Sequence, residues 1–112
     1  MTKNNFVYVG HMIDMARKAL KFVEGKNRKD FDADEQLRLS LTHLIQVIGE
    51  AARHLSDDFY QKYPQIPWPS IVGMRHKVVH DYMNIDEDLV WETVTHELPE
   101  LIQQLEKIMP KK

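Results

Sequence analysis

The chain contains no cysteine among its 112 residues. This excludes disulfide bonds, thiolate zinc sites and cysteine nucleophiles, and it fits a reducing cytosol. Long apolar runs are also lacking, because Asp14, Arg17 and Lys18 interrupt the first apolar stretch. That stretch therefore predicts neither a signal peptide nor a membrane span. We expect a cytoplasmic protein without membrane contact, with one domain over residues 1–112.

An excess of positive charge is lacking as well. Fifteen basic and seventeen acidic residues give a formal net charge of -2. This is the wrong sign for a protein that binds nucleic acid by bulk electrostatics. Basic residues cluster at positions 53–54, 75–77 and 111–112, although such runs are usually solvated surface. Any contact with RNA is therefore expected to be local.

Apolar spacing predicts amphipathic helices in the first half of the chain. Apolar residues recur at alternating intervals of three and four over residues 6–23, which predicts a helix ending near Gly25. Asp32 and Glu35 have the spacing of a capping box, and a second apolar stripe follows them to about His54. The sequence therefore predicts two long helices here.

Small residues, caps and prolines mark the middle of the chain. Gly49 and its alanine neighbours leave little side chain in the way, so another helix backbone could approach the second helix there. Ser56 has the pattern of an N-cap and opens a short helix that stops before Pro64. Pro69 suits a first helical turn, which predicts a third helix over residues 70–80.

The last apolar stripe predicts a fourth long helix. Asn84 and Glu87 form a second capping-box pair, and the stripe then runs to Ile108. Pro99 within it predicts a kink or a break. No strand is predicted, and the backbone is expected to loosen only over residues 81–84. The expected fold is all-α, an up-and-down antiparallel four-helix bundle with one additional short helix.

The densest group of reactive side chains lies in the segment GMRHKVVHDY, which holds Arg75, His76, Lys77, His80, Asp81 and Tyr82. On a straight helix, residues five apart point about 140° from each other. Arg75 and His80 therefore require one of three arrangements. The helix loosens at His80, the long arginine reaches around, or a second subunit completes a shared cleft.

An arginine beside a histidine suits phosphodiester cleavage. A neutral imidazole takes the proton of a ribose 2′-hydroxyl, while a guanidinium holds the charge that develops on the phosphoryl oxygens. The structural alternative is that His80 caps a helix end, Arg75 forms a surface ion pair and Tyr82 packs at the helix end. The sequence pattern alone leaves both interpretations open.

Other candidates are weaker. His76 and His80 are four apart, which would place both imidazoles on one helix face as a metal site, although Arg75 and Lys77 flank the pair with positive charge. Glu50 could face a polar cleft or simply lie at the surface. We expect Trp68 and Trp91 to close the core rather than to stack on bases. We expect neither a metal nor a cofactor in the site.

These motifs resemble those of the HEPN superfamily, in particular its HepT-type toxins. The resemblance covers nearly the whole chain, through the segments HLIQVIGEAARHLS, YPQIPWPSIVGMR, RHKVVHDY and DLVWETVTHELPEL in the expected order. In that family an arginine, four intervening residues and a histidine form the ribonuclease motif, matched here by Arg75 and His80. A tyrosine two residues further on is matched by Tyr82. The position after the arginine, often asparagine in relatives, is His76.

The resemblance implies a function and its partners. The family forms homodimers whose two motifs line one cleft and cleave RNA, either transfer or messenger RNA, without a metal. It also implies an MNT-type nucleotidyltransferase antitoxin that transfers AMP onto the tyrosine, here Tyr82. Beside Arg75, His80 and Tyr82, the possible supporting residues of the site are His76, Lys77, Asp81 and Glu50. The competing hypothesis is a catalytically weak module that binds a nucleotide or docks the nucleotidyltransferase. The net charge of -2 favours that alternative slightly.

Overall fold

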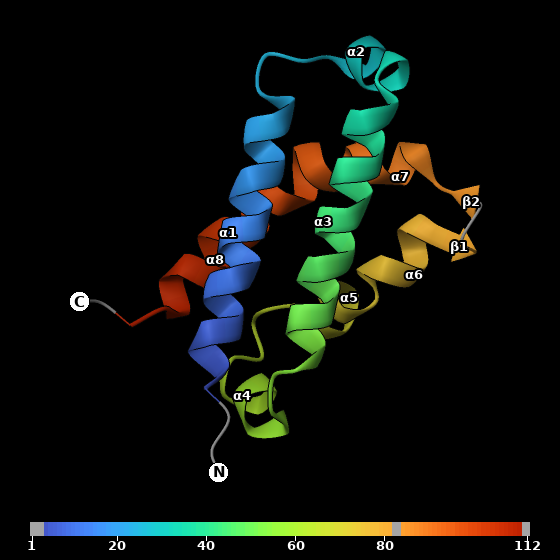
Figure 1. The fold of residues 1–112 in the computed structure, drawn as a ribbon. Coiled ribbons are helices and arrows are strands. Elements are labelled where there is room, and N and C mark those ends of the chain that lie inside the picture. The colour runs from blue at the N-terminus through green and yellow to red at the C-terminus, as the bar shows by residue number, and fades with distance from the viewer. Residues whose placement is uncertain (1–3, 82–83, 111–112) are drawn as a thin grey trace.

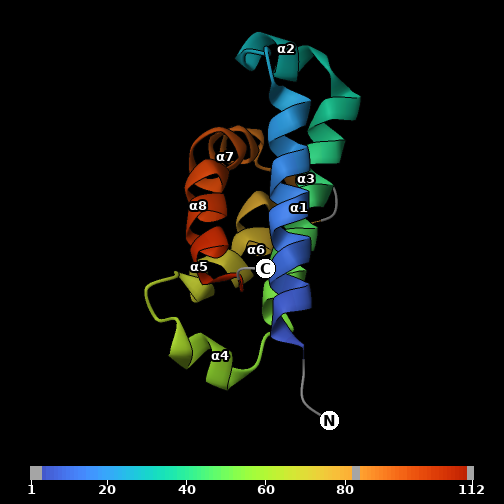
Figure 2. The same ribbon diagram turned by 90° about the vertical axis from the view of Figure 1, so that its left-hand side faces the viewer.

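Three long helical runs form the body of the protein. The computed structural model describes residues 4–81 and 84–110, with the backbone alone at His80 and Asp81. Helices α1 (Asn5–Val23) and α3 (Glu35–Arg53) lie side by side, and α8 (Leu98–Ile108) packs on α1 (Figure 1). Figure 2 shows α7 and α8 on one side of the α1–α3 pair. The all-α class is therefore confirmed.

One continuous apolar core joins these helices. Its fully buried side chains come from every long helix and include Met12, Phe31, Leu41, Ile45, Ile48, Ile71, Val90, Leu98 and Leu105. The apolar stripes predicted from spacing are the faces that meet in this core. Within residues 4–81 and 84–110, no helix is both long and apolar enough to cross a bilayer.

The link between α1 and α3 contains a helix that the sequence did not reveal. Helix α2 (Arg28–Ala33) starts at a capping box in which Asn27 and Asp30 bond each other's backbone N–H. The predicted box at Asp32 was wrong, because Asp34 is the N-cap of α3 and accepts from the backbone N–H of Leu37 at 3.0 Å. Asp34 takes the capping position because it directly precedes α3, where its carboxylate reaches the unpaired backbone N–H three residues further on.

The short helix after Ser56 is confirmed as α4 (Asp57–Lys62), with the Ser56 hydroxyl accepting from the backbone N–H of Phe59 at 3.3 Å. The Asn5 side chain bonds both the backbone and the hydroxyl of Ser56, which ties the start of α1 to the start of α4. This contact fixes α4 and the connector after it at one end of the α1–α3 pair.

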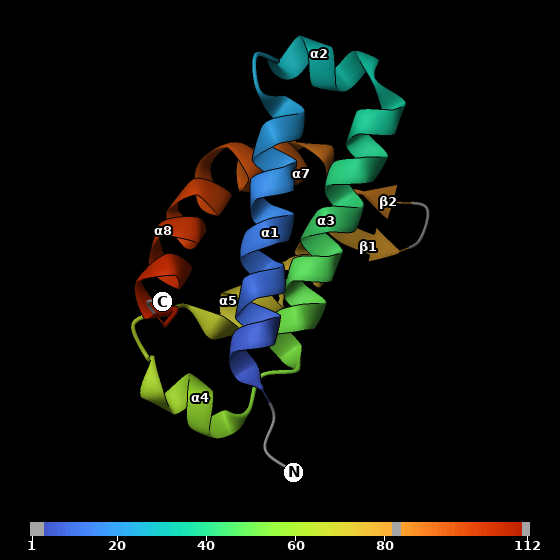
Figure 3. The same cartoon turned by 60° about the vertical axis from the view of Figure 1, so that its left-hand side comes forward.

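The third predicted helix was wrong in its extent. Two short helices, α5 (Trp68–Val72) and α6 (Met74–Val78), replace it, and Pro69 lies in the first turn of α5 as predicted. The backbone then becomes extended in strand β1 (Val79–Asp81), which pairs antiparallel with β2 (Asn84–Ile85) at the end of α6 (Figure 3). This hairpin also contradicts the prediction of no strands.

The last predicted helix is interrupted just before Pro99, as the sequence predicted. It consists of α7 (Glu87–Glu92), a π-helix η1 (Thr93–Glu97) and α8, and Pro99 lies in the first turn of α8. The wider π turn accommodates the missing backbone donor of the proline. The predicted cap at Asn84 was wrong, because Asp86 caps α7 by accepting from the backbone N–H of Leu89 at 3.0 Å.

The close helix approach predicted at Gly49 is confirmed. A Cβ atom there would lie 3.2 Å from the backbone oxygen of Ile71 and 3.4 Å from that of Val72. We expect Gly49→Ala to lower the free energy of unfolding by about 1–2 kcal/mol, because overpacking outweighs the gain in helix propensity. Gly10→Ala is the matched control, since its Cβ would be 4.0 Å from its nearest neighbour, the Met109 side chain. It is expected to gain about 0.5–1 kcal/mol. Urea unfolding measures both, and equal gains would show that α5 shifts freely.

Candidate functional site

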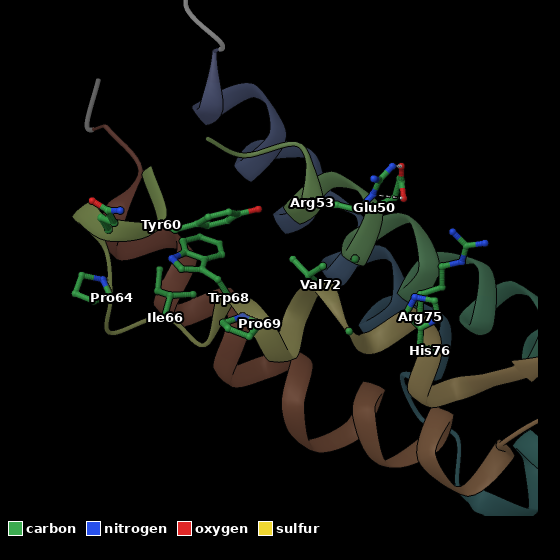
Figure 4. A pocket seen from close by; sticks show the side chains of 13 residues that line it. Glu50, Arg53, Tyr60, Pro64, Ile66, Trp68, Pro69, Val72, Arg75 and His76 are labelled. Carbon is green, nitrogen blue, oxygen red and sulfur yellow. Dashed lines mark hydrogen bonds and ion pairs between the residues drawn. The ribbon is translucent and has the colours of Figure 1, made fainter. Parts of the chain in front are cut away.

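A cavity of about 1050 Å³ lies between α3, the α4–α5 connector and α6. Figure 4 shows its two ends, with Glu50, Arg53, Arg75 and His76 at one end and the connector side chains at the other. Of the residues predicted for the site, Arg75, His76 and Glu50 thus line one cavity. These residues come from α3 and α6, two helices that are distant in the sequence.

Helix α6 positions Arg75 through its buried neighbours. Met74 and Val78 face the core, with exposed fractions of 7% and 1%. The remaining side chains of this short helix, Arg75, His76 and Lys77, are exposed. Arg75 thus presents its guanidinium to solvent from a helix anchored on both sides. Lys77 shares this exposed surface, although the cavity lining found in the described residues does not include it.

Glu50 is paired with Arg53 at the rim of the cavity. The Arg53 guanidinium donates to both Glu50 oxygens, at 2.7 and 3.3 Å, and the His54 Nε2 atom lies 3.4 Å from the Glu50 carboxylate. The hydrogen bond from Arg53 holds the pKa of Glu50 below its usual value, and the nearby charge of Arg75 lowers it as well. Glu50 is therefore an ionised partner of arginines and is unsuited to donating a proton near neutral pH.

The straight helix assumed for Arg75 and His80 ends between them. The helix stops at Val78, and His80 lies in the extended backbone of β1. The backbone N–H of Asp86 donates to the Val78 carbonyl at 2.7 Å, which holds the chain in its new direction. The first of the three predicted arrangements, loosening of the helix before His80, is thus the one that the backbone adopts. Tyr82 lies outside the described residues.

The predicted helical metal pair loses its basis for the same reason. His76 lies on α6 and His80 on β1, so a spacing of four no longer places both on one helix face. In the part of the chain that the structure describes, no three histidine or acidic side chains gather at a possible metal position.

Two lining residues, Arg53 and Tyr60, were missed as site residues. Arg53 could have been found, because a pair three residues apart on a helix brings its side chain to Glu50. Tyr60 could not, since it reaches the cavity only through the way α4 and its connector fold back against α3. Both tryptophans pack as predicted, with Trp68 beside Phe59 and Trp91 beside Phe31 at ring-centroid distances of 5.8 and 5.2 Å.

An all-α domain with an arginine-bearing cavity, and a histidine two residues beyond the helix that carries the arginine, agrees with the HEPN class expected from the sequence. The chain belongs to the HepT-like family, described as "Ribonuclease HepT-like", which matches residues 12–108. It is similar to a protein of Caldanaerobacter subterraneus subsp. tengcongensis named "Putative RNase TTE0752", with 33% identity over 93% of each chain. It is also similar to "Probable ribonuclease HepT" of Thermococcus cleftensis, with 31% identity over 80% of this chain and 86% of the other. No solved structure gives a significant match.

Proposed function

We propose that this protein is an endoribonuclease toxin that cleaves RNA without a metal. Family membership and the relatives named as ribonucleases support the proposal. The observation that carries it is the placement of Arg75 at the cavity, exposed on an anchored helix that ends two residues before His80. A phosphate in the cavity would meet the Arg75 guanidinium there, carried by an anchored helix, with the motif histidine on the following strand.

The chemistry assigned to these residues is a transesterification. His80 takes the proton of a ribose 2′-hydroxyl, and the 2′-oxygen attacks the adjacent phosphorus. The bond from phosphorus to the 5′-oxygen breaks, and that oxygen takes a proton from water, while the protonated His80 returns its proton to the solvent. The products are a cyclic phosphate end and a 5′-hydroxyl end. Arg75 stabilises the negative charge that develops on the phosphoryl oxygens, and its fork of donors suits a phosphate better than a point charge would.

The proposal includes partners. Two copies of the chain would place their motifs along one cleft, and the protein would act in the cytoplasm on transfer or messenger RNA. An MNT-type nucleotidyltransferase encoded alongside would transfer AMP from ATP to Tyr82. In that step the tyrosine oxygen attacks the α-phosphorus and pyrophosphate leaves.

Induced expression tests the function in cells. Wild type and His80→Ala are expressed in a bacterium without the nucleotidyltransferase, and growth and RNA are followed. We expect growth arrest with discrete RNA fragments from the wild type alone. Equal growth without fragments in both cultures would contradict the proposal and favour the alternative of a binding module, which has no toxicity to lose.

Metal independence is tested separately with the purified protein. We expect RNA cleavage to continue at an unchanged rate in excess EDTA, because an imidazole and a guanidinium supply the proton transfer and the charge stabilisation. A matched reaction to which zinc or manganese is returned after chelation should show no increase. Loss of cleavage with chelator and its recovery with one of these ions would establish a metal enzyme instead.

A further inference from the structure

The cavity that receives Arg75 also has an apolar half with no role in the proposed chemistry. Its wall comes from α4, the connector and α5, and it is mostly apolar or aromatic, with one neutral polar side chain: Tyr60, Gln61, Pro64, Ile66, Trp68, Pro69 and Val72. The charged half comes from α3 and α6, so the cavity is divided by polarity along its length (Figure 4). A ligand that fills it needs an anionic end and a flat or apolar end.

The aromatic surface of this half is held in place before any ligand arrives. The Tyr60 hydroxyl donates to the backbone oxygen of Ala52, and burial raises the pKa of Tyr60, which keeps that donor protonated. Behind it, Trp68 is 4% exposed and donates from Nε1 to the Tyr63 oxygen at 2.9 Å, with its ring 5.7 Å from that of Tyr60. The polar atoms of both rings are therefore engaged, and Tyr60 offers mainly its ring to the cavity.

Size and charge narrow the class of ligand. A cavity of about 1050 Å³ has room for a nucleoside with its phosphate. The guanidiniums of Arg53 and Arg75 outnumber the single carboxylate of Glu50 in the lining, so the charged half favours an anion. An RNA strand carries both requirements in each nucleotide, since unpaired bases stack on aromatic side chains while arginines hold the phosphates.

We propose that the apolar half of this cavity binds one unpaired nucleobase of the RNA, beside the phosphate held by Arg75. This inference rests on the proposed ribonuclease function and adds its specificity. A base inside a duplex cannot leave its stack to enter the cavity without losing its pairing. The site therefore selects single-stranded segments or loops, and Tyr60 and Val72 are its specificity-determining residues.

Binding to RNA that cannot be cleaved tests this proposal. The probes are short, fluorescently labelled 2′-O-methyl homo-oligomers of A, C and U, together with an abasic oligomer carrying the same phosphates. Without a free 2′-hydroxyl none of them can react, so a failed ribonuclease function would not disturb the readout. We expect the wild type to bind its best base-containing probe about tenfold more tightly than the abasic one, as measured by fluorescence anisotropy.

Matched variants locate the preference. Tyr60→Ala removes the ring, and Val72→Met lengthens a side chain into the apolar half without adding a ring, so each should reduce the difference between base-containing and abasic probes. Tyr60→Phe keeps the ring, and Val7→Met makes the same replacement at an exposed position of α1, so both should retain the difference. Should Tyr60→Ala fail to fold by circular dichroism, Val72→Met decides the question.

Two results would overturn the inference. One is a wild type that binds all probes equally. The other is a base preference that survives undiminished in Val72→Met. If that variant also changes its oligomeric mass on gel filtration, the apolar half is assigned to a protein contact instead.

Discussion

Replacing His80 by alanine is expected to lower kcat/KM for RNA cleavage by about 10²–10⁴-fold, the usual contribution of a positioned general acid or base. The loss should appear in kcat, since the imidazole acts in the transition state and contributes little to holding the substrate. The measurement is initial-rate cleavage of a labelled RNA by purified protein. His76→Ala is the matched control, because it removes an imidazole from the cavity lining but leaves the motif intact.

Two further measurements show whether the loss in His80→Ala comes from the chemical step rather than from weaker substrate binding or a less stable fold. His80→Ala should bind a 2′-O-methyl probe as tightly as the wild type does and should unfold at the same temperature. If His76→Ala loses as much cleavage as His80→Ala does, the assignment of the general base to His80 is wrong.

Transfer of AMP to Tyr82 is expected to abolish cleavage, and Tyr82→Phe to escape this inhibition completely. The added phosphodiester carries a negative charge and is attached seven residues after Arg75. A charge that reaches Arg75 would occupy its guanidinium and repel an RNA phosphate. The experiment co-expresses the partner nucleotidyltransferase with each variant and follows growth together with the intact mass of the protein. Wild type should gain the mass of AMP and cause no arrest, whereas Tyr82→Phe should stay unmodified and remain toxic.

The control for this experiment is Tyr63→Phe, which removes a hydroxyl from the connector side of the molecule. It should be modified and neutralised like the wild type. Neutralisation of Tyr82→Phe without any gain in mass would mean that the partner inhibits by binding alone, and the assignment of Tyr82 as the switch would fail.

Long helices could be predicted from the sequence because their apolar spacing is repeated over several turns. The stripes of α1 and α3 survive in the buried residues from Val9 to Ala19 and from Leu37 to Ala52. The short α2 has room for little more than one turn of such a pattern, so its capping box had to be recognised on its own. A neighbouring pair with the same spacing, Asp32 and Glu35, obscured it.

The break before His80 was one of three arrangements that the sequence left open, and it could not be selected from the sequence because it depends on a partner later in the chain. Val78 and Val79 are β-branched and suit the end of a helix as well as a strand. The decision comes from the pairing of Val79 with Ile85 and from the Asp86 N–H, and neither contact shows in the local spacing. Each reactive residue of the motif could be recognised in the sequence, whereas the cavity that Arg75 and His76 share with Tyr60 exists only after the connector has folded over α3.

The boundary at Val78 divides the motif between two units of unequal local stability. Arg75 belongs to a helix whose Met74 and Val78 are embedded in the core, so moving it requires opening a large part of the protein. His80 belongs to a hairpin of two short strands, and such a ladder adds little free energy of its own. Ile85 pairs with Val79 and packs against the edge of the core, so substitutions there are expected to loosen the backbone that carries His80 before they disturb the helix that carries Arg75. In the proposed ribonuclease, the proton-transfer side of the motif would thus be lost more easily than the phosphate-binding side.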